Sequence, residues 1–132
     1  MTNQGRITVE SSQNGHPVPI INNVYLHSVI DPIEEAALEM KQFEDKILSN
    51  NNILILGLGF GYHIDECERI LRRYNTQYRI YVVEPDEELI GKFQSTRKCN
   101  HLKIFHSQNA HELYNNFEYI NFLLKKPIII PH

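Results

Sequence analysis

The stretch Asn52-Ile53-Leu54-Ile55-Leu56-Gly57-Leu58-Gly59-Phe60-Gly61-Tyr62-His63 decides the fold of this chain. Its apolar run, residues 53–56, is typical of a short β-strand that is covered on both faces. The run ends in three glycines spaced G-x-G-x-G, and a helical pattern of apolar residues follows them. A strand, a glycine turn and a helix in this order predict a Rossmann-like half-fold.

Towards the carboxyl terminus, strand and helix patterns continue to alternate. Beyond the helix that starts after Gly61, the expected elements are a strand Tyr78–Val83, a short helix about Asp86–Phe93, a strand Leu102–Phe105, a helix from 109 to 125, and a strand Pro127–Ile130. The last helix carries its apolar positions at Ala110, Leu113, Phe117, Ile120 and Leu124. Such alternation predicts parallel strands joined by right-handed crossovers.

Towards the amino terminus, residues 6–30 alternate as strands do and contain two turn signals, Asn14-Gly15 and Asn22-Asn23. They predict an antiparallel β-meander with strands Ile7–Ser11, His16–Ile21 and Val24–Ser28. A helix from Pro32 to about Leu48 follows, capped by Asp31, with Ile33, Ala36 or Ala37, Met40, Phe43 or Glu44, and Ile47 as its apolar stripe.

The predicted fold class is therefore α/β, a Rossmann-like half-fold with a mostly parallel sheet, preceded by a small antiparallel β-meander. The meander, residues 1–30, is too small to stand alone and should pack on the main unit, residues 31–132. A chain of 132 residues with 42% hydrophobic content can bury a core as one compact domain.

Composition argues against several classes of function. Thirteen basic and sixteen acidic residues give a formal charge of −3 without an extended basic cluster, so a nucleic-acid partner is not expected. No apolar run is long enough to span a membrane. Cys67 and Cys99 suit reduced thiols in a cytoplasmic protein. Because His101 and His106 should face opposite sides of a strand, they do not predict a metal site.

The spacing of the glycines narrows the class of ligand. The dinucleotide fingerprint is G-x-G-x-x-G, and here Tyr62 occupies the place of its third glycine. This spacing favours a turn of the S-adenosylmethionine type. Glu84 ends the next strand, where Rossmann-like domains keep an acid that accepts hydrogen bonds from ribose hydroxyls. Gly57, Gly59, Gly61 and Glu84 are thus the predicted cofactor-binding residues.

Other features argue against a ligand. Ile55 stands where many methyltransferases of similar pattern carry an acid, and Phe60 and Tyr62 are bulky enough to fill the crevice. Asp65 and Glu66 lie in the first turn of the following helix, where they would repel a pyrophosphate. The glycines could equally be present only because a strand must reverse tightly into a helix.

No catalytic residue is predicted. His27, Ser28 and Asp31 include the residue types of a nucleophilic triad, but one short segment cannot arrange three such groups, so we interpret them as a strand end followed by a helix cap.

Three segments together resemble a known family. They are Tyr25-Leu26-His27-Ser28-Val29-Ile30-Asp31-Pro32-Ile33-Glu34-Glu35-Ala36, the strand and turn from Ile53 to His63, and Val82-Val83-Glu84-Pro85-Asp86. The combination is similar to the amino-terminal region of the Maf family, motility-associated glycosyltransferases that attach nonulosonic acids to flagellin. The resemblance spans most of residues 7–132. Ile30 departs from it, since relatives commonly have tyrosine there.

The resemblance implies an amino-terminal module, because the family's sugar-transfer chemistry is associated with a further domain after this region. Such a module would dock flagellin, support that catalytic domain or hold a nucleotide-like ligand. A scaffolding module predicts a crevice filled by Phe60 or Tyr62 and an exposed apolar patch where a partner packs. An adenosyl-binding, methyltransferase-like domain predicts an open crevice bordered by Gly59, Gly61 and Glu84. A nucleotide-sugar binder is the third hypothesis, weakened by Asp65 and Glu66.

Overall fold

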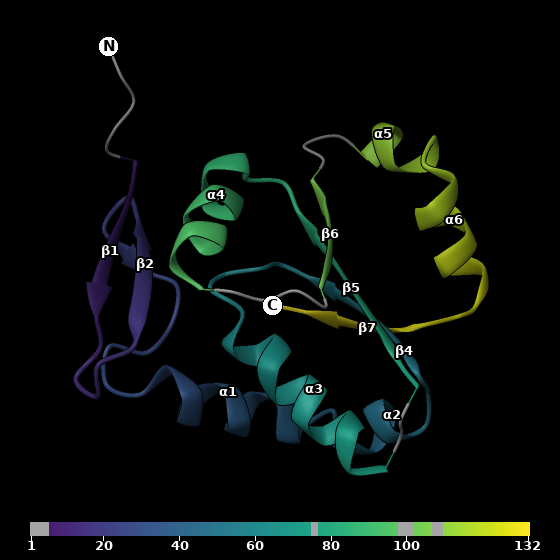
Figure 1. Cartoon of the computed structure of the whole chain (residues 1–132), viewed down its shortest axis with the longest axis horizontal. Helices are drawn as coiled ribbons and strands as arrows, with labels where there is room; N and C mark the ends of the chain where they lie inside the picture. Colours follow the sequence, from purple (N-terminus) through teal and green to yellow (C-terminus); the bar gives the residue numbers. More distant parts are fainter. Residues whose placement is uncertain (1–5, 75–76, 98–101, 107–109) are drawn as a thin grey trace.

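The structure, a computed structural model, describes residues 6–74, 77–97, 102–106 and 110–132 (Figure 1). It contains an antiparallel three-stranded sheet of order β1-β2-β3 and a parallel four-stranded sheet of order β6-β5-β4-β7. This arrangement confirms the predicted Rossmann-like half-fold with a preceding meander. Cys99, His101 and the predicted helix start at 109 lie outside the described residues.

The parallel sheet forms around the apolar run that ends in the glycine turn. Its strands are β4 (Asn52–Leu56), β5 (Arg79–Glu84), β6 (Lys103–His106) and β7 (Ile128–Pro131). Ile53 is in register with Ile80 of β5 on one side and with Ile128 of β7 on the other. Two crossover helices link the first three strands, α3 (Tyr62–Tyr74) and α4 (Glu87–Thr96). Strands β4 and β5 are therefore parallel neighbours joined by a helix, as predicted.

Helices lie on both faces of this sheet (Figure 1). The helices of one face are α1 (Pro32–Lys41), α2 (Glu44–Leu48) and α3, whose apolar side chains form one core cluster with Ile53, Ile55, Ile80, Val82 and Ile130. On the other face lie α5 (Ala110–Tyr114) and α6 (Phe117–Leu124), and Phe122 of α6 stacks on Tyr81 with ring centroids 4.0 Å apart. Side chains alternate between the faces along each strand, so the apolar runs are buried on both sides.

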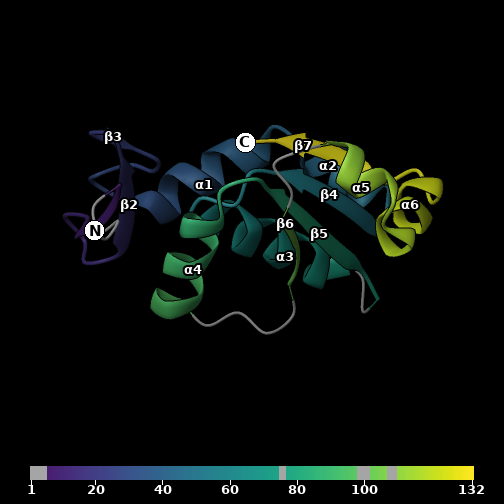
Figure 2. The same ribbon diagram turned by 90° about the horizontal axis from the view of Figure 1, so that it is seen from above.

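The meander lies at one end of the molecule and α6 at the other (Figure 2). Its strands are β1 (Ile7–Ser11), β2 (Pro17–Ile21) and β3 (Val24–Tyr25), with both turn asparagines, Asn22 and Asn23, at positive φ. The prediction of a third strand as long as Val24–Ser28 was wrong, because after Tyr25 the chain turns inward and buries His27.

Two predicted helices are each divided in the structure. The helix expected from Pro32 to Leu48 breaks at Gln42–Phe43, where half-buried Phe43 packs against the core and Ile47 of α2 is then fully buried. The helix expected from 109 to 125 breaks at Asn116, whose side chain caps α6 by accepting from the Tyr119 amide.

The predicted apolar stripes were wrong at three positions. Ile33 is 46% exposed, Phe117 85% and Leu124 73%, because the helices turn other residues towards the sheet.

Among the described helices, none combines the length and the apolar character needed to cross a membrane.

Candidate functional site

The three glycines of the predicted site line the turn from β4 into α3. Gly57, Gly59 and Gly61 all have positive φ, at 111°, 51° and 80°. A residue with a side chain is strained in this region of backbone conformation. The sharp reversal from strand to helix therefore depends on glycine at each of these positions.

Groups of this same chain stand directly over the glycines. A Cβ atom on Gly57 would lie 3.1 Å from the carbonyl oxygen of His132, and one on Gly61 would lie 2.9 Å from the ring of Phe93. On Gly59 it would lie 2.6 Å from Nε2 of His27, closer than real Cβ contacts allow. In Rossmann-like folds a ligand occupies this space, at the carboxyl ends of the strands. Here His27 from the loop after β3, Phe93 of α4 and His132 after β7 lie within 4 Å of these Cβ positions.

Glu84, the predicted ribose acceptor, is buried at the end of β5 with 6% of its surface exposed. Its Oε1 accepts a hydrogen bond from the amide of Leu58 at 2.9 Å, and its Oε2 accepts from the amide of Asp86 at 2.9 Å. Both carboxylate oxygens thus bind backbone, one in the glycine turn and one at the start of α4. Glu84 holds the two loops together at the edge where ribose hydroxyls would be expected.

His27 is the residue of this site that the sequence interpretation missed. Its Nε2 accepts a hydrogen bond from the amide of Phe60 at 2.8 Å, which requires an unprotonated Nε2. Burial lowers the pKa of His27 to about 3, with repulsion from His132 and Arg97 as smaller causes. Asp31 accepts from the amides at the start of α1, as expected of a cap. His27 and Asp31 therefore have separate structural roles: His27 binds the backbone of the glycine turn, and Asp31 caps α1.

A second buried histidine lies beside the first. The Nε2 of His63 donates to the carbonyl of Gly57 at 2.9 Å, and its Nδ1 has no hydrogen-bond partner within the described residues. The His63 ring stacks on His132 with centroids 3.6 Å apart, and His132 approaches Glu39 at 3.2 Å. Burial, then repulsion from His132, lowers the pKa of His63 to about 3. We name His27, His63 and His132 the histidine cluster.

Bulky side chains fill the remainder of the turn. Phe60 is fully buried with its ring 6.5 Å from that of Phe93, and the Tyr62 hydroxyl donates to the Pro17 carbonyl of the meander at 2.6 Å. The guanidinium of Arg97 lies 4.4 Å from the Tyr62 ring centroid and donates to the Phe60 carbonyl. Phe60 and Tyr62 are thus both buried against other parts of the chain, at 0% and 4% exposure.

The acids at the start of α3 both have basic partners. Asp65 pairs with Arg97, the residue that follows α4, and buried Glu66 pairs with Arg69 one turn further along α3. The repulsion that we expected Asp65 to exert on an anionic ligand is therefore offset by Arg97. The sequence held no signal for this pair, because 32 residues separate its members.

Both buried histidines are neutral near pH 7 and engaged through Nε2. Burial raises the pKa of the free Cys67 thiol to about 12, which makes it a poor nucleophile. Within the described residues, no three His, Cys, Asp or Glu side chains gather as a metal site would require.

Comparison with protein-family models gave no match, and neither did comparison with curated protein sequences. Among solved structures, the fold of this chain is similar to the crystal structure of MNMC2 from Aquifex aeolicus, with a TM-score of 0.52 and 15% sequence identity. The similarity covers 86% of this chain and 46% of the other, so this chain spans about half the length of that structure. At this identity the likeness shows a shared fold.

Proposed function

We propose that this chain is a non-catalytic Rossmann-like module that supports or docks a partner, in the manner of the amino-terminal region of the Maf family. The observation that carries the proposal is the contact over Gly59, where His27 stands 2.6 Å from the position of a Cβ atom. A module whose crevice is filled by its own chain has a structural use for the glycines without any ligand. A cytoplasmic location is part of the proposal, in keeping with flagellin as the partner.

Exposed apolar side chains on β4 and β7 support the docking part of the proposal. Leu56 and Ile129 are 39% and 52% exposed on one face of the sheet. Strand β7 is also the last strand of the sheet order among the described residues. Apolar patches beside a sheet edge commonly mark protein interfaces.

The first experiment is a calorimetric titration with S-adenosylmethionine, S-adenosylhomocysteine and a cytidine-monophosphate-linked sugar. We expect no saturable binding at the glycine turn. An NMR titration with the same compounds maps any binding that does occur to residues 57–61 or to another part of the surface. Saturable binding that shifts the amides of residues 57–61 would contradict the proposal.

The second experiment tests docking with purified flagellin and with a Maf-type catalytic domain. We expect Ile129→Lys to weaken binding to one of them, because it places a charge at an exposed apolar position of β7. Leu38→Lys is the matched control, since Leu38 is 63% exposed on α1, on the other face of the sheet. If both variants bind as strongly as the original chain, the face of the sheet around Ile129 is not part of the interface.

The alternative function is an S-adenosylmethionine-binding, methyltransferase-like domain. The observation that favours it is the sheet order β6-β5-β4-β7, which places the glycine turn and the end of β5 at the point where Rossmann-like folds bind ligands. For this function His27 and His132 would have to leave the positions over Gly59 and Gly57. The titration with the two adenosyl compounds decides between the functions.

A further inference from the structure

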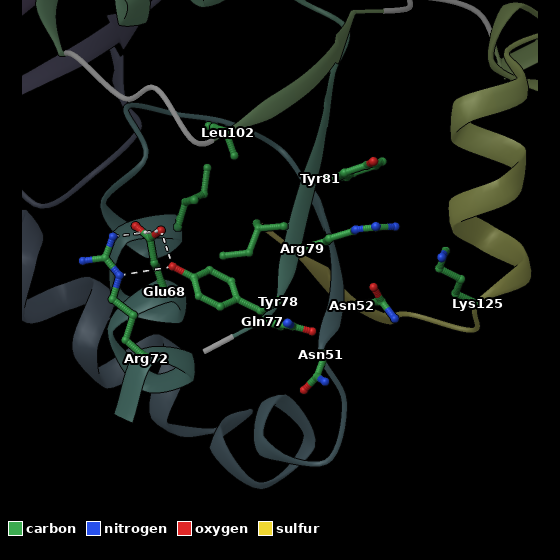
Figure 3. A pocket seen from close by; sticks show the side chains of 12 residues that line it. Asn51, Asn52, Glu68, Arg72, Gln77, Tyr78, Arg79, Tyr81, Leu102 and Lys125 are labelled. Carbon is green, nitrogen blue, oxygen red and sulfur yellow. Dashed lines mark hydrogen bonds and ion pairs between the residues drawn. The ribbon is translucent and has the colours of Figure 1, made fainter. Parts of the chain in front are cut away.

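A pocket of about 710 Å³ lies at the amino ends of the parallel strands, opposite the glycine turn (Figure 3). Its walls include Asn52 at the start of β4, Arg79 at the start of β5, and Lys125 at the end of α6. A smaller hollow of about 460 Å³ adjoins it and shares Arg79, Tyr81 and Lys125. Pockets of this size commonly hold a small organic molecule.

One wall of the pocket is electrically balanced. Arg72 pairs with Glu68 at 3.3 Å and donates to the Tyr78 hydroxyl at 3.1 Å, and that hydroxyl donates to Glu68 at 2.7 Å (Figure 3). Ile64 and Leu102 add apolar surface beside this group. The charges of this wall are thus satisfied by internal bonds.

The opposite wall carries two cations without acidic partners. Among the described residues, neither Arg79 nor Lys125 forms an ion pair, and both line both hollows. Glu118, the acid of the smaller hollow, is engaged by Lys103 at 3.2 Å and by the Tyr81 hydroxyl at 3.1 Å. Figure 3 shows the Arg79 and Lys125 side chains extending towards the same gap. Two like charges directed at one space repel each other unless an anion lies between them.

Asn52 adds a neutral donor to the same place. It is in register with Arg79 across the β4–β5 pair, so the two side chains share a face of the sheet. An amide and two cations that converge on one pocket form a typical recognition set for an oxyanion. The formal charge of the whole chain is −3, so this local excess of positive charge does not follow from its composition.

We propose that this pocket binds a small organic anion through its phosphate or carboxylate group. The oxyanion lies between Arg79 and Lys125 with Asn52 as a further donor. The site is independent of the proposed scaffolding function, because it lies at the other end of the sheet from the glycine turn.

The test is an NMR titration of the backbone amides with inorganic phosphate and, separately, with citrate, at an ionic strength held constant with sodium chloride. We expect saturable shifts at Asn52, Arg79 and Lys125 with at least one of the two anions, and the preferred anion identifies the chemical group. Arg79→Gln should weaken the binding about tenfold or more, the loss of one charge-assisted contact of about 1.4 kcal/mol.

Arg73→Gln is the control variant, because Arg73 is exposed on α3 and lines neither hollow. Unaltered binding in this control, with thermal unfolding of both variants equal to that of the original chain, would support the site. The proposal is wrong if neither anion gives saturable shifts, if sodium chloride alone reproduces them, or if Arg79→Gln and Arg73→Gln weaken binding equally.

Discussion

Gly59 gives the sharpest test of how the crevice is filled. Alanine at Gly59 would be strained by a φ of 51° and would also place its Cβ 2.6 Å from His27. Alanine at Gly15 would be strained by a φ of 89° but would meet no atom within 4 Å. Strain in positive φ costs roughly 1–2 kcal/mol, and a forced contact in a packed interior adds about 1–3 kcal/mol.

We therefore expect Gly59→Ala to lower the free energy of unfolding by at least about 1 kcal/mol more than Gly15→Ala does. Urea denaturation of the two variants measures the difference. An equal loss would mean that His27 moves aside freely, as it would have to for a ligand to enter.

Glu84 tests whether the strand-end acid supports the backbone. Glu84→Gln replaces one acceptor by an amide group that faces a backbone N–H, so one buried amide loses its partner. We expect a loss of about 1.5–3 kcal/mol in the free energy of unfolding, measured by urea denaturation. Glu87→Gln is the control, because Glu87 is exposed in the first turn of α4, and it should stay within about 0.5 kcal/mol of the original chain. If both substitutions change the free energy of unfolding equally, the hydrogen bonds of Glu84 do not stabilise the fold.

Sequence reasoning located the glycines and Glu84 at the carboxyl ends of adjacent strands, but it did not find what covers them. His27 and Arg97 are separated from Phe60 by 33 and 37 residues, and both bind its backbone. Local sequence patterns indicate on which face of a helix or strand a residue lies. They do not indicate which segment, distant in sequence, packs against that face. The difference between a ligand crevice and a filled one lies in those distant contacts.

The periodicity of apolar residues predicted which helices and strands exist better than it predicted where a helix is interrupted. Strands β4 and β5 were predicted to within one residue, because apolar runs bounded by turn residues are distinct. The break between α1 and α2 was missed because Met40 and Ile47, on either side of it, keep helical spacing and are both buried. The break before α6 did have a signal in Asn116, a preferred helix-capping residue.

Two glycine substitutions, one inside α4 and one in the glycine turn that α4 contacts, should change the stability in opposite directions. Gly91 lies inside α4, and a Cβ there would meet no atom within 4 Å, so Gly91→Ala should stabilise the protein by about 0.5–1 kcal/mol. Gly61→Ala should destabilise it, because the new Cβ would lie 2.9 Å from Phe93 of the same helix. Thermal unfolding of both variants measures the two shifts. A destabilised Gly91→Ala variant would show that α4 is packed more closely than the structure describes.

For the molecule as a whole, the histidine cluster joins three parts of the chain that are distant in sequence. His27 follows the meander, His63 lies in the first turn of α3, and His132 follows β7, where its amide donates to the carbonyl of Leu56 at 2.9 Å. Further attachments of the meander run from Tyr62 to the Pro17 carbonyl, from Arg6 to Asp86 and Glu88 at the start of α4, and from the Ile7 amide to Glu88. A change that opens the cluster should therefore loosen the meander from the parallel sheet.

Acid is the simplest such change. The pKa of both His27 and His63 falls from an ordinary value of 6.5 to about 3 on folding, because burial disfavours the charged ring. Below pH 6.5 the unfolded chain binds protons that the folded chain does not, so the free energy of unfolding decreases as the pH falls towards 3. Each histidine contributes a slope of up to about 1.4 kcal/mol per pH unit in this window. Among the described residues, His132, Glu35 and Arg97 are the charged or titratable groups that face these rings, and Glu39 pairs with His132.

Urea denaturation at a series of pH values from about 7.5 to 4.5 isolates this effect, because most carboxylates of the unfolded chain remain ionised there. We expect the free energy of unfolding to decrease steadily below pH 6.5. His27→Gln keeps an acceptor near the position of Nε2 and removes the titrating group, so its slope should be smaller by as much as one proton. His106→Gln, at an exposed position in β6, controls for the loss of an imidazole from the surface. Parallel profiles for the original chain and His27→Gln would mean that the His27 ring is hydrated in the folded state, and the filled crevice would then have to be abandoned.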